Sequence, residues 1–294
     1  MSEYSCTLSA ACTKPVAVHL AHSYFIHMKV RQTIAFALLT AYALVSTGCV
    51  TTNLHKFRMT ASEAPEVHGA NTNMEQNSTS WRFTGKVNYN YEKKVDISED
   101  IYWNKSLDEL FDGNNLESSD AAYKMGGFDF TGKIDFLYKS NYFVFGLGAG
   151  YKDGLINHVT FGWNFSHVEF GVFTGVYNQY GDVEYSGEVV SDEEGGDDHE
   201  RIREKDSQIN TSFFAGAYIG YYIDKFFTNY SVSFYTPSPK INGNALSVPT
   251  ITSHYFTVGY RFNQWIEISA GGILTDIDGT GTNGGYTGGI SLYL

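Results

Sequence analysis

A period-2 alternation of apolar and polar side chains recurs along the chain from Trp81 to Leu294. In its first stretch the apolar residues share one parity, namely Trp81, Phe83, Val87, Tyr89 and Tyr91. Polar residues take the other parity, namely Arg82, Thr84, Lys86, Asn88 and Asn90. Because successive side chains of a β-strand point to opposite faces, each stretch predicts a strand with one apolar and one polar face. About ten such stretches follow one another, which is typical of a transmembrane β-barrel.

The connections between the expected strands differ in length in a regular way. Tight turns are expected at Ser140-Asn141, Ser166-His167, Asp224-Lys225 and Asn263-Gln264. An acidic loop is expected from about Ser186 to Ser207. Outer-membrane barrels have short periplasmic turns and longer external loops. The sequence therefore predicts an all-β, antiparallel up-and-down transmembrane barrel over residues 80–294, with both termini periplasmic.

Composition limits the classes of partner. The formal net charge is −12, which argues against nucleic acid because such binding needs a basic surface. The chain has 22 Tyr and 21 Phe, yet no apolar run after position 50 is long enough for a spanning helix. Many aromatic residues without long apolar runs fit strands that are apolar on one face only.

The start of the chain has the pattern of an export signal. Residues 28–48 begin with Met28 and two basic residues and continue with an apolar stretch. Gly48-Cys49 resembles the lipobox of bacterial lipoproteins, which implies lipidation of Cys49; an ordinary secretory signal cleaved near Gly48 is the alternative. Residues 1–27 are interpreted as the product of a mis-assigned upstream start, and their Cys and His residues are not expected to bind metal. Residues 49–79 lack periodicity and predict a flexible tether.

Residues 80–294 resemble the small bacterial outer-membrane β-barrel class. The likeness rests on the pattern as a whole and on an alternating last strand, with Tyr286, Ile290, Leu292 and Leu294 on one parity. It implies a place in the outer membrane of a Gram-negative bacterium, with outer-membrane lipids and the barrel assembly machinery as partners. A soluble up-and-down barrel with its apolar face inward is the structural alternative. Charges of both signs on the polar parity favour the membrane protein.

These charges are the main candidate site. The expected lumen charge network consists of Arg82, Lys86, Asp129, Lys133, Asp135, Glu169, Arg261 and Glu267. Neighbouring strands predict that Asp129 and Asp135 pair with the first three cations, and that Arg261 pairs with Glu267. An unpaired charge in a narrow lumen is costly, so the network predicts a largely closed lumen. The favoured function is a structural or surface-interaction barrel, with a narrow porin-like channel as one alternative.

The other alternative is a hydrolase at the external rim, as in some outer-membrane proteases with Asp and His at that position. Asp197-Asp198-His199-Glu200 has suitable residue types, but it lies in the expected acidic loop. Asp276-Ile277-Asp278-Gly279-Thr280-Gly281 lacks the glutamate of a calcium loop, and His158 has no serine at usable spacing. We therefore expect no enzymatic activity, cofactor or metal. The acidic loops are candidates for binding cations or an extracellular ligand.

Overall fold

The computed structural model describes residues 50–69, 74–97, 102–103, 120–193, 196–241, 244–278 and 281–294. One of its two compact units comprises Thr51–Val190 and His199–Leu294. The other comprises Met1–Val50 and Ser191–Asp198, of which the described part is only the ends of strands. Within the described ranges all regular elements are strands. No helix among these residues is long and apolar enough to cross a membrane.

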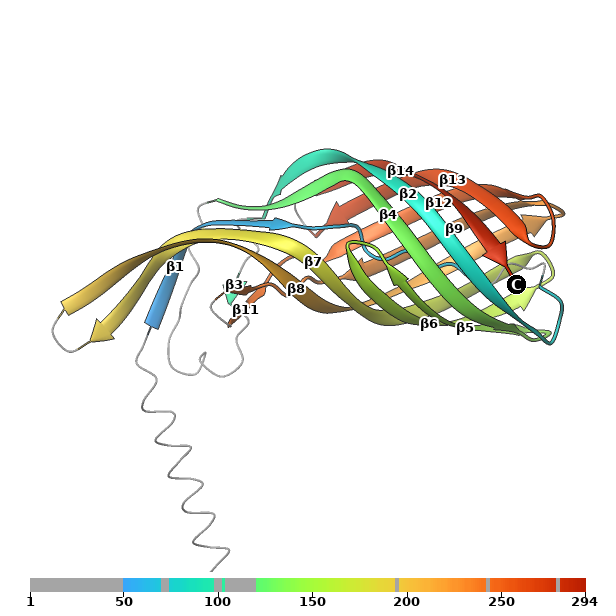
Figure 1. Cartoon of the computed structure of the whole chain (residues 1–294), viewed down its shortest axis with the longest axis horizontal. Coiled ribbons are helices and arrows are strands. Elements are labelled where there is room, and N and C mark those ends of the chain that lie inside the picture. Colours follow the sequence, from blue (N-terminus) through green and yellow to red (C-terminus); the bar gives the residue numbers. More distant parts are fainter. Residues whose placement is uncertain are drawn as a thin grey trace, which may run out of the picture. The chain divides into compact units, whose positions relative to one another are not determined.

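Ten antiparallel strands close into a barrel (Figure 1). They are β2 (Ser78–Asp96), β4 (Ala121–Lys139), β5 (Phe143–Tyr151), β6 (Gly154–Phe165), β7 (Val168–Glu193), β8 (Gly196–Ile223), β9 (Phe226–Tyr235), β12 (Ile251–Arg261), β13 (Ile266–Ile277) and β14 (Gly281–Tyr293). The order around the ring is β4-β2-β14-β13-β12-β9-β8-β7-β6-β5, and β5 returns to β4. A separate small sheet consists of β3 (Tyr102–Trp103), β10 (Lys240–Ile241) and β11 (Asn244–Ser247). The predicted fold class is thus confirmed.

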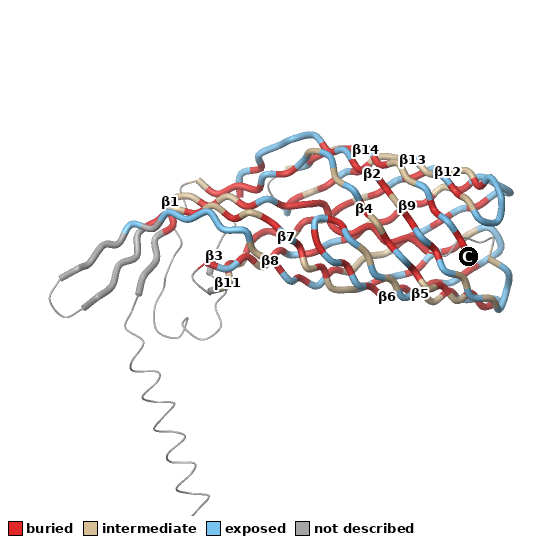
Figure 2. The backbone as a smooth tube through the Cα atoms, in the orientation of Figure 1, coloured by how far each residue is buried: buried red, intermediate tan, exposed pale blue. Residues whose placement is uncertain are grey.

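The two faces of the barrel wall follow the alternation in the sequence. On β2, Trp81 and Val87 point outward and are about half exposed, whereas Arg82 and Lys86 point inward and are buried. Phe128 on β4 is 81% exposed. Figure 2 shows buried and exposed residues alternating along the strands. The barrel therefore has an apolar outer face and a polar interior, because register keeps each parity on one side of the sheet.

The two ends of the barrel differ in their connections. Four short links join β4 to β5, β6 to β7, β8 to β9 and β12 to β13, and we call this the turn end. Two of these links contain residues with positive φ, Ser166 (50°) and Asp224 (49°), as tight turns require. The opposite loop end carries the other five links: long ones from β2 to β4 and from β9 to β12, and short ones from β5 to β6, β7 to β8 and β13 to β14. Leu294 pairs with Trp81 at the turn end.

An additional strand, β1 (Val50–Thr60), completes the wall at the loop end. The hairpin of β5 and β6 is short, and its pairing with β4 begins only at Gly132. The part of β4 at the loop end instead pairs in parallel with β1, from Phe57 opposite Ala121 to Thr60 opposite Lys124. β1 also pairs with β7. It fills the place that β5 and β6 leave open, and its buried side chains join an apolar core inside the loop end.

Two predictions about non-barrel segments were wrong. The expected flexible tether over residues 49–79 contains strand β1, and the buried residues 61–69 follow it directly. The expected acidic loop from Ser186 to Ser207 is largely a continuation of β7 and β8, which run to Glu193 and from Gly196. Pairing between neighbouring strands outweighs the low strand propensity of acidic residues in this hairpin.

Candidate functional site

The interior of the barrel is occupied by the chain's own residues 61–69, which we call the lumen segment. All nine residues are buried although none belongs to a strand. The segment follows β1 from the loop end. The described chain resumes at Met74, whose carbonyl accepts a hydrogen bond at 3.0 Å from Lys139 at the turn end. The chain thus passes from the loop end to the turn end before the first barrel strand begins.

Side chains of the barrel wall satisfy the backbone carbonyls of the lumen segment. A buried carbonyl without a partner is costly, so an extended segment outside a sheet needs such donors. The donor and acceptor pairs are Tyr235 to Ser62 (2.8 Å), Tyr255 to Ala64 (2.6 Å), Lys133 to Glu66 (2.6 Å), Ser231 to Val67 (2.9 Å), and Arg82 to both His68 (3.0 Å) and Gly69. These donors come from β2, β4, β9 and β12. They hold the segment from several sides of the lumen.

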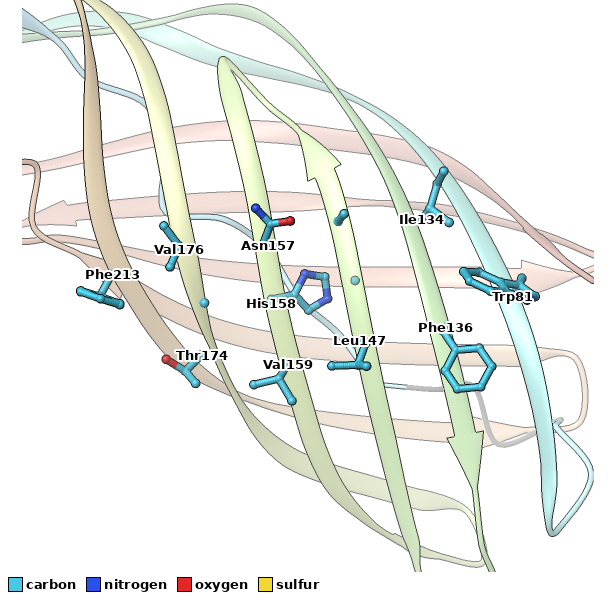
Figure 3. A pocket seen from close by; sticks show the side chains of 13 residues that line it. Trp81, Ile134, Phe136, Leu147, Asn157, His158, Val159, Thr174, Val176 and Phe213 are labelled. Carbon is cyan, nitrogen blue, oxygen red and sulfur yellow. The ribbon is translucent and has the colours of Figure 1, made fainter.

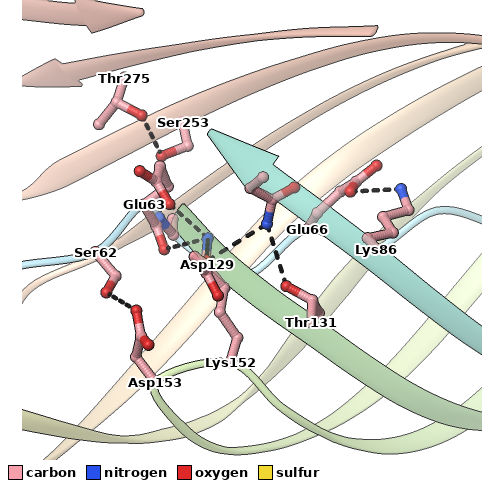
Figure 4. Close-up of polar contacts among 12 residues, drawn as sticks. Ser62, Glu63, Glu66, Lys86, Asp129, Thr131, Lys152, Asp153, Ser253 and Thr275 are labelled. Carbon is pink, nitrogen blue, oxygen red and sulfur yellow. Dashed lines mark hydrogen bonds and ion pairs between the residues drawn. The ribbon is translucent and has the colours of Figure 1, made fainter. Parts of the chain in front are cut away.

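Two glutamates of the lumen segment neutralise lysines of the wall (Figure 4). Glu63 accepts from Lys152 at 2.7 Å, and Glu66 accepts from Lys86 at 2.6 Å. All four side chains are at most 8% exposed. Lys152 also lies 3.4 Å from Asp129 of β4. Because burial strips these charges of water, each pair must be satisfied within the protein.

The structure brings together one of the ion pairs expected between β2 and β4. Arg82 contacts Asp135 at 2.7 Å, and their side chains are 1% exposed. Lys86 does not pair with Asp129 or Asp135, because its partner is Glu66 of the lumen segment. Lys133 donates to the backbone carbonyl of Glu66. The segment therefore supplies partners that the strand pattern alone does not contain.

The remaining charges of the expected network lie toward the turn end. Arg261 and Glu267 contact each other at 3.3 Å across β12 and β13, as their register predicts. Glu267 also accepts from the hydroxyl of Tyr293 at 3.3 Å. Glu169 accepts from Tyr218 at 3.0 Å. The eight expected residues thus form separate contacts along the lumen.

His158 lies inside the wall beside Asp135, with 3.1 Å between His158 Nε2 and the carboxylate. A glycine on the neighbouring strand makes room for this pair, because a Cβ at Gly148 would lie 2.2 Å from the imidazole and 2.3 Å from Asp135. Asp135 is shared with Arg82, whose guanidinium also donates to the carbonyls of His68 and Gly69 in the lumen segment. The pair is therefore held in a filled interior.

Sequence reasoning missed the residues that bind the lumen segment, chiefly Glu63, Glu66, Lys152, Tyr235 and Tyr255. These residues belong to no recognisable sequence motif. One signal was present in the sequence before them, since Lys56, Phe57, Arg58 and Met59 alternate as in a strand. That short alternation marks β1, which directs the following residues into the barrel.

The other candidate sites are separate from the lumen. The backbone of Asp197–Glu200 belongs to β8, and the side chains lie outside the described residues. Asp276 lies in β13, which ends at Ile277 just before Asp278, and the next two residues of that motif are outside the described ranges. Cys49 and residues 1–48 also lie outside them. The side chains that the structure describes contain no group of three or more His, Cys, Asp or Glu residues able to hold a metal ion.

The outer face carries an apolar hollow with a volume of about 840 Å³ (Figure 3). Trp81, Phe136, Leu147 and Phe213 line it together with the smaller residues Gly148 and Gly175. The hollow belongs to the outward apolar surface and is lined by few polar atoms.

Comparison with solved structures finds bacterial outer-membrane proteins at low similarity. The TodX monoaromatic hydrocarbon channel deltaS2 mutant is 7% identical over 74% of this chain and 90% of its own, with a TM-score of 0.29. A loop L8 deletion mutant of OmpT, an outer membrane protein of Vibrio cholerae, is 12% identical over 74% and 98%, with a TM-score of 0.28. A Pseudomonas aeruginosa FadL homologue is 10% identical over 74% and 89%, with a TM-score of 0.25. The fold is assigned from the strand order and register of this chain itself.

No protein-family model matches the chain, and no curated protein matches it.

Proposed function

We propose that this protein is a bacterial outer-membrane β-barrel whose lumen is closed by its own N-terminal residues 61–69, and that its role is structural or surface-interacting. The observation that carries the proposal is the set of buried contacts between the lumen segment and the wall. Carbonyl groups and both glutamates of the segment are held by side chains from strands around the ring. A lumen filled in this way leaves little room for a solute.

The apolar outer face supports insertion in a membrane. Large apolar patches in contact with water are rare on soluble monomers, because exposing them is unfavourable. Here large apolar residues are exposed on the outer face of several strands, including Phe128 (81%) and Phe130 (62%) on β4 and Phe213 (81%) on β8. A soluble barrel would place this face inward, whereas the interior holds the charged and hydrogen-bonded groups. Outer-membrane lipids are therefore the proposed surroundings, and the barrel assembly machinery is the proposed insertion partner.

The turn end is the proposed periplasmic end, since short turns face the periplasm in this class of barrel. Leu294 is then periplasmic. The start of β1 lies at the opposite, loop end. The expectation that both termini are periplasmic stays a prediction for the N-terminus, which lies outside the described residues. Lipidation of Cys49 is kept as a separate proposal on the lipobox resemblance alone.

We assign no enzymatic activity to the barrel. The side chains of His158 and Asp135 are buried, and Asp135 is held in an ion pair with Arg82, which a substrate would have to displace. The acidic residues at the loop end are proposed to contact cations or an extracellular ligand. A narrow channel is the alternative role, and it requires the lumen segment to leave space for ions.

Conductance measurements test the closed lumen directly. We expect the full-length protein to fractionate with outer membranes, to resist carbonate extraction and to show heat-modifiable migration in gels. In planar bilayers it is expected to give no large, regular channels. Large regular currents from the unmodified protein would favour the channel, and recovery as a soluble periplasmic protein would refute membrane insertion itself.

A further inference from the structure

The outer face of the wall carries a group of basic residues just beyond its apolar part at the loop end. β4 bends there at Gly126 and Gly127, whose φ values of 109° and 105° favour glycine. Opposite them, the pairing of β2 shifts register between Asn90 and Lys93. The bend separates the apolar outer face below it from a charged outer face above it. Figure 1 shows β2 and β4 curving in this region.

Three cations on three adjacent strands form the centre of this charged face, and we call them the basic triad. They are Arg58 on β1, Lys124 on β4 and Lys94 on β2. Asp120, immediately before β4, accepts from Lys94 at 2.8 Å and from Arg58 at 3.0 Å, one cation on each carboxylate oxygen. The side chains of Arg58, Lys94 and Asp120 are 41%, 52% and 42% exposed, so the triad is accessible from outside.

The triad contains an electrostatic arrangement that an anion would relieve. Lys94 and Lys124 stand directly opposite each other in the register of β2 and β4. Like charges directly opposite on neighbouring strands are destabilising. Asp120 contacts two of these three cations, Lys94 and Arg58.

Charges of both signs surround the triad on the outer face. Lys56 pairs with Glu184 of β7, and Lys205 pairs with Asp182 at 3.4 Å. These pairs neutralise themselves beside the triad. Asp96 lies two residues beyond Lys94, and Arg203 adds a further exposed cation on β8. The three cations of the triad thus stand in a chain whose formal net charge is −12.

The position of the triad relative to the apolar face indicates the kind of anion. Lys124 and Phe128 lie on the same outward row of β4, four residues apart, which is about 13 Å along a strand. A lipid can therefore place its acyl chains against Phe128 and its charged headgroup against the triad. Basic clusters next to a membrane surface attract anionic lipids by about 1 kcal/mol for each cation.

We propose that the basic triad is a binding site for the phosphate groups of a phosphorylated membrane lipid at the external surface. The site rests on the proposed membrane insertion but not on closure of the lumen. Phosphate oxygens accept hydrogen bonds from guanidinium and ammonium groups, so one headgroup offsets the repulsion between Lys94 and Lys124.

The test measures lipid binding by the full-length protein in detergent. The probe is lipid A carrying its phosphates, compared with the same lipid after dephosphorylation and with inorganic phosphate alone, and the readouts are native mass spectrometry and thermal stability. The test variant is Arg58→Gln/Lys94→Gln/Lys124→Gln. Lys225→Gln, in an exposed turn at the other end of the barrel, is the matched control.

We expect phosphorylated lipid A to bind the unmodified protein and the control alike, and the triple variant to bind about fivefold more weakly for each cation removed, which is about 1 kcal/mol each. The single Lys124→Gln variant serves if the triple variant does not fold. Equal binding of both lipid forms, or equal losses in test and control variants, would overturn the proposal. So would stabilisation by inorganic phosphate with no further effect of lipid, which would indicate a free-anion site. Conductance is measured in parallel, because it tests closure of the lumen alone.

Discussion

Replacing Glu66 by Gln tests whether the lumen segment holds buried charges in the wall. Glu66 and Lys86 lie 2.6 Å apart, with side chains 8% and 4% exposed. Removing one partner of a buried ion pair costs about 3–5 kcal/mol, because the other charge remains buried without compensation. The glutamine oxygen still accepts a hydrogen bond from Lys86, so we expect the lower end, about 3 kcal/mol.

The assay is reversible urea unfolding in lipid vesicles, followed by tryptophan fluorescence. Glu75→Gln is the control, since Glu75 is exposed near the turn end, and its effect should stay within about 0.5 kcal/mol. The double variant Glu66→Gln/Lys86→Gln removes both charges and should be more stable than Glu66→Gln alone. If Glu66→Gln behaves like Glu75→Gln and the double variant recovers nothing, the buried pair does not exist and the reasoning fails.

Four further outcomes follow from the structure. In a His55→Cys variant the new thiol, exposed on β1, should react with an impermeant maleimide on intact cells. In an Asn141→Cys variant the thiol should react only after the cells are permeabilised. The opposite pattern would mean that the barrel is inverted. Gly148→Ala should destabilise the barrel by about 1–3 kcal/mol, because the new Cβ would clash with His158 and Asp135. Gly272→Ala should leave the stability unchanged, because its Cβ would meet nothing closer than 3.9 Å. The urea midpoints of the two variants measure the difference. Hydrogen bonds from Lys94 and then Arg58 lower the pKa of Asp120. The contact of Asp120 with β1 therefore contributes its full stability above the unfolded pKa of about 4, and this stability is lost as the pH falls through the lowered pKa of the folded state. Cleavage of β1 by protease should then increase only in strong acid. Intact mass should show a mature chain that begins at an acylated Cys49 after translation from Met28, and another N-terminus without acyl mass would remove lipidation.

The barrel was predictable because each wall strand repeats one simple rule. Trp81 and Phe83 lie outward and Arg82 inward because a strand alternates its faces, and the register then pairs Arg82 with Asp135. Tight turns at Ser166 and Asp224 were also visible from residue type. These features depend on neighbours in sequence or on adjacent strands.

The lumen segment was not predictable in the same way. Ser62, Glu63 and Glu66 have no periodicity, and their partners lie on strands that are distant in sequence. Lys86 pairs with Glu66 rather than with Asp129 because the segment enters the lumen, which the wall pattern cannot reveal. Only the short alternation of apolar and charged residues in β1 indicates from the sequence that the chain before the first barrel strand is structured.

The position of the lumen segment also constrains how the molecule assembles. The ring closes where β14 pairs with β2, and β14 is the last strand of the chain. Residues 61–69 precede every barrel strand, so they are already synthesised when that seam forms. The sheet can therefore close around the segment, and lysine and tyrosine side chains of the wall can bind its carbonyl groups and glutamates as each strand is added.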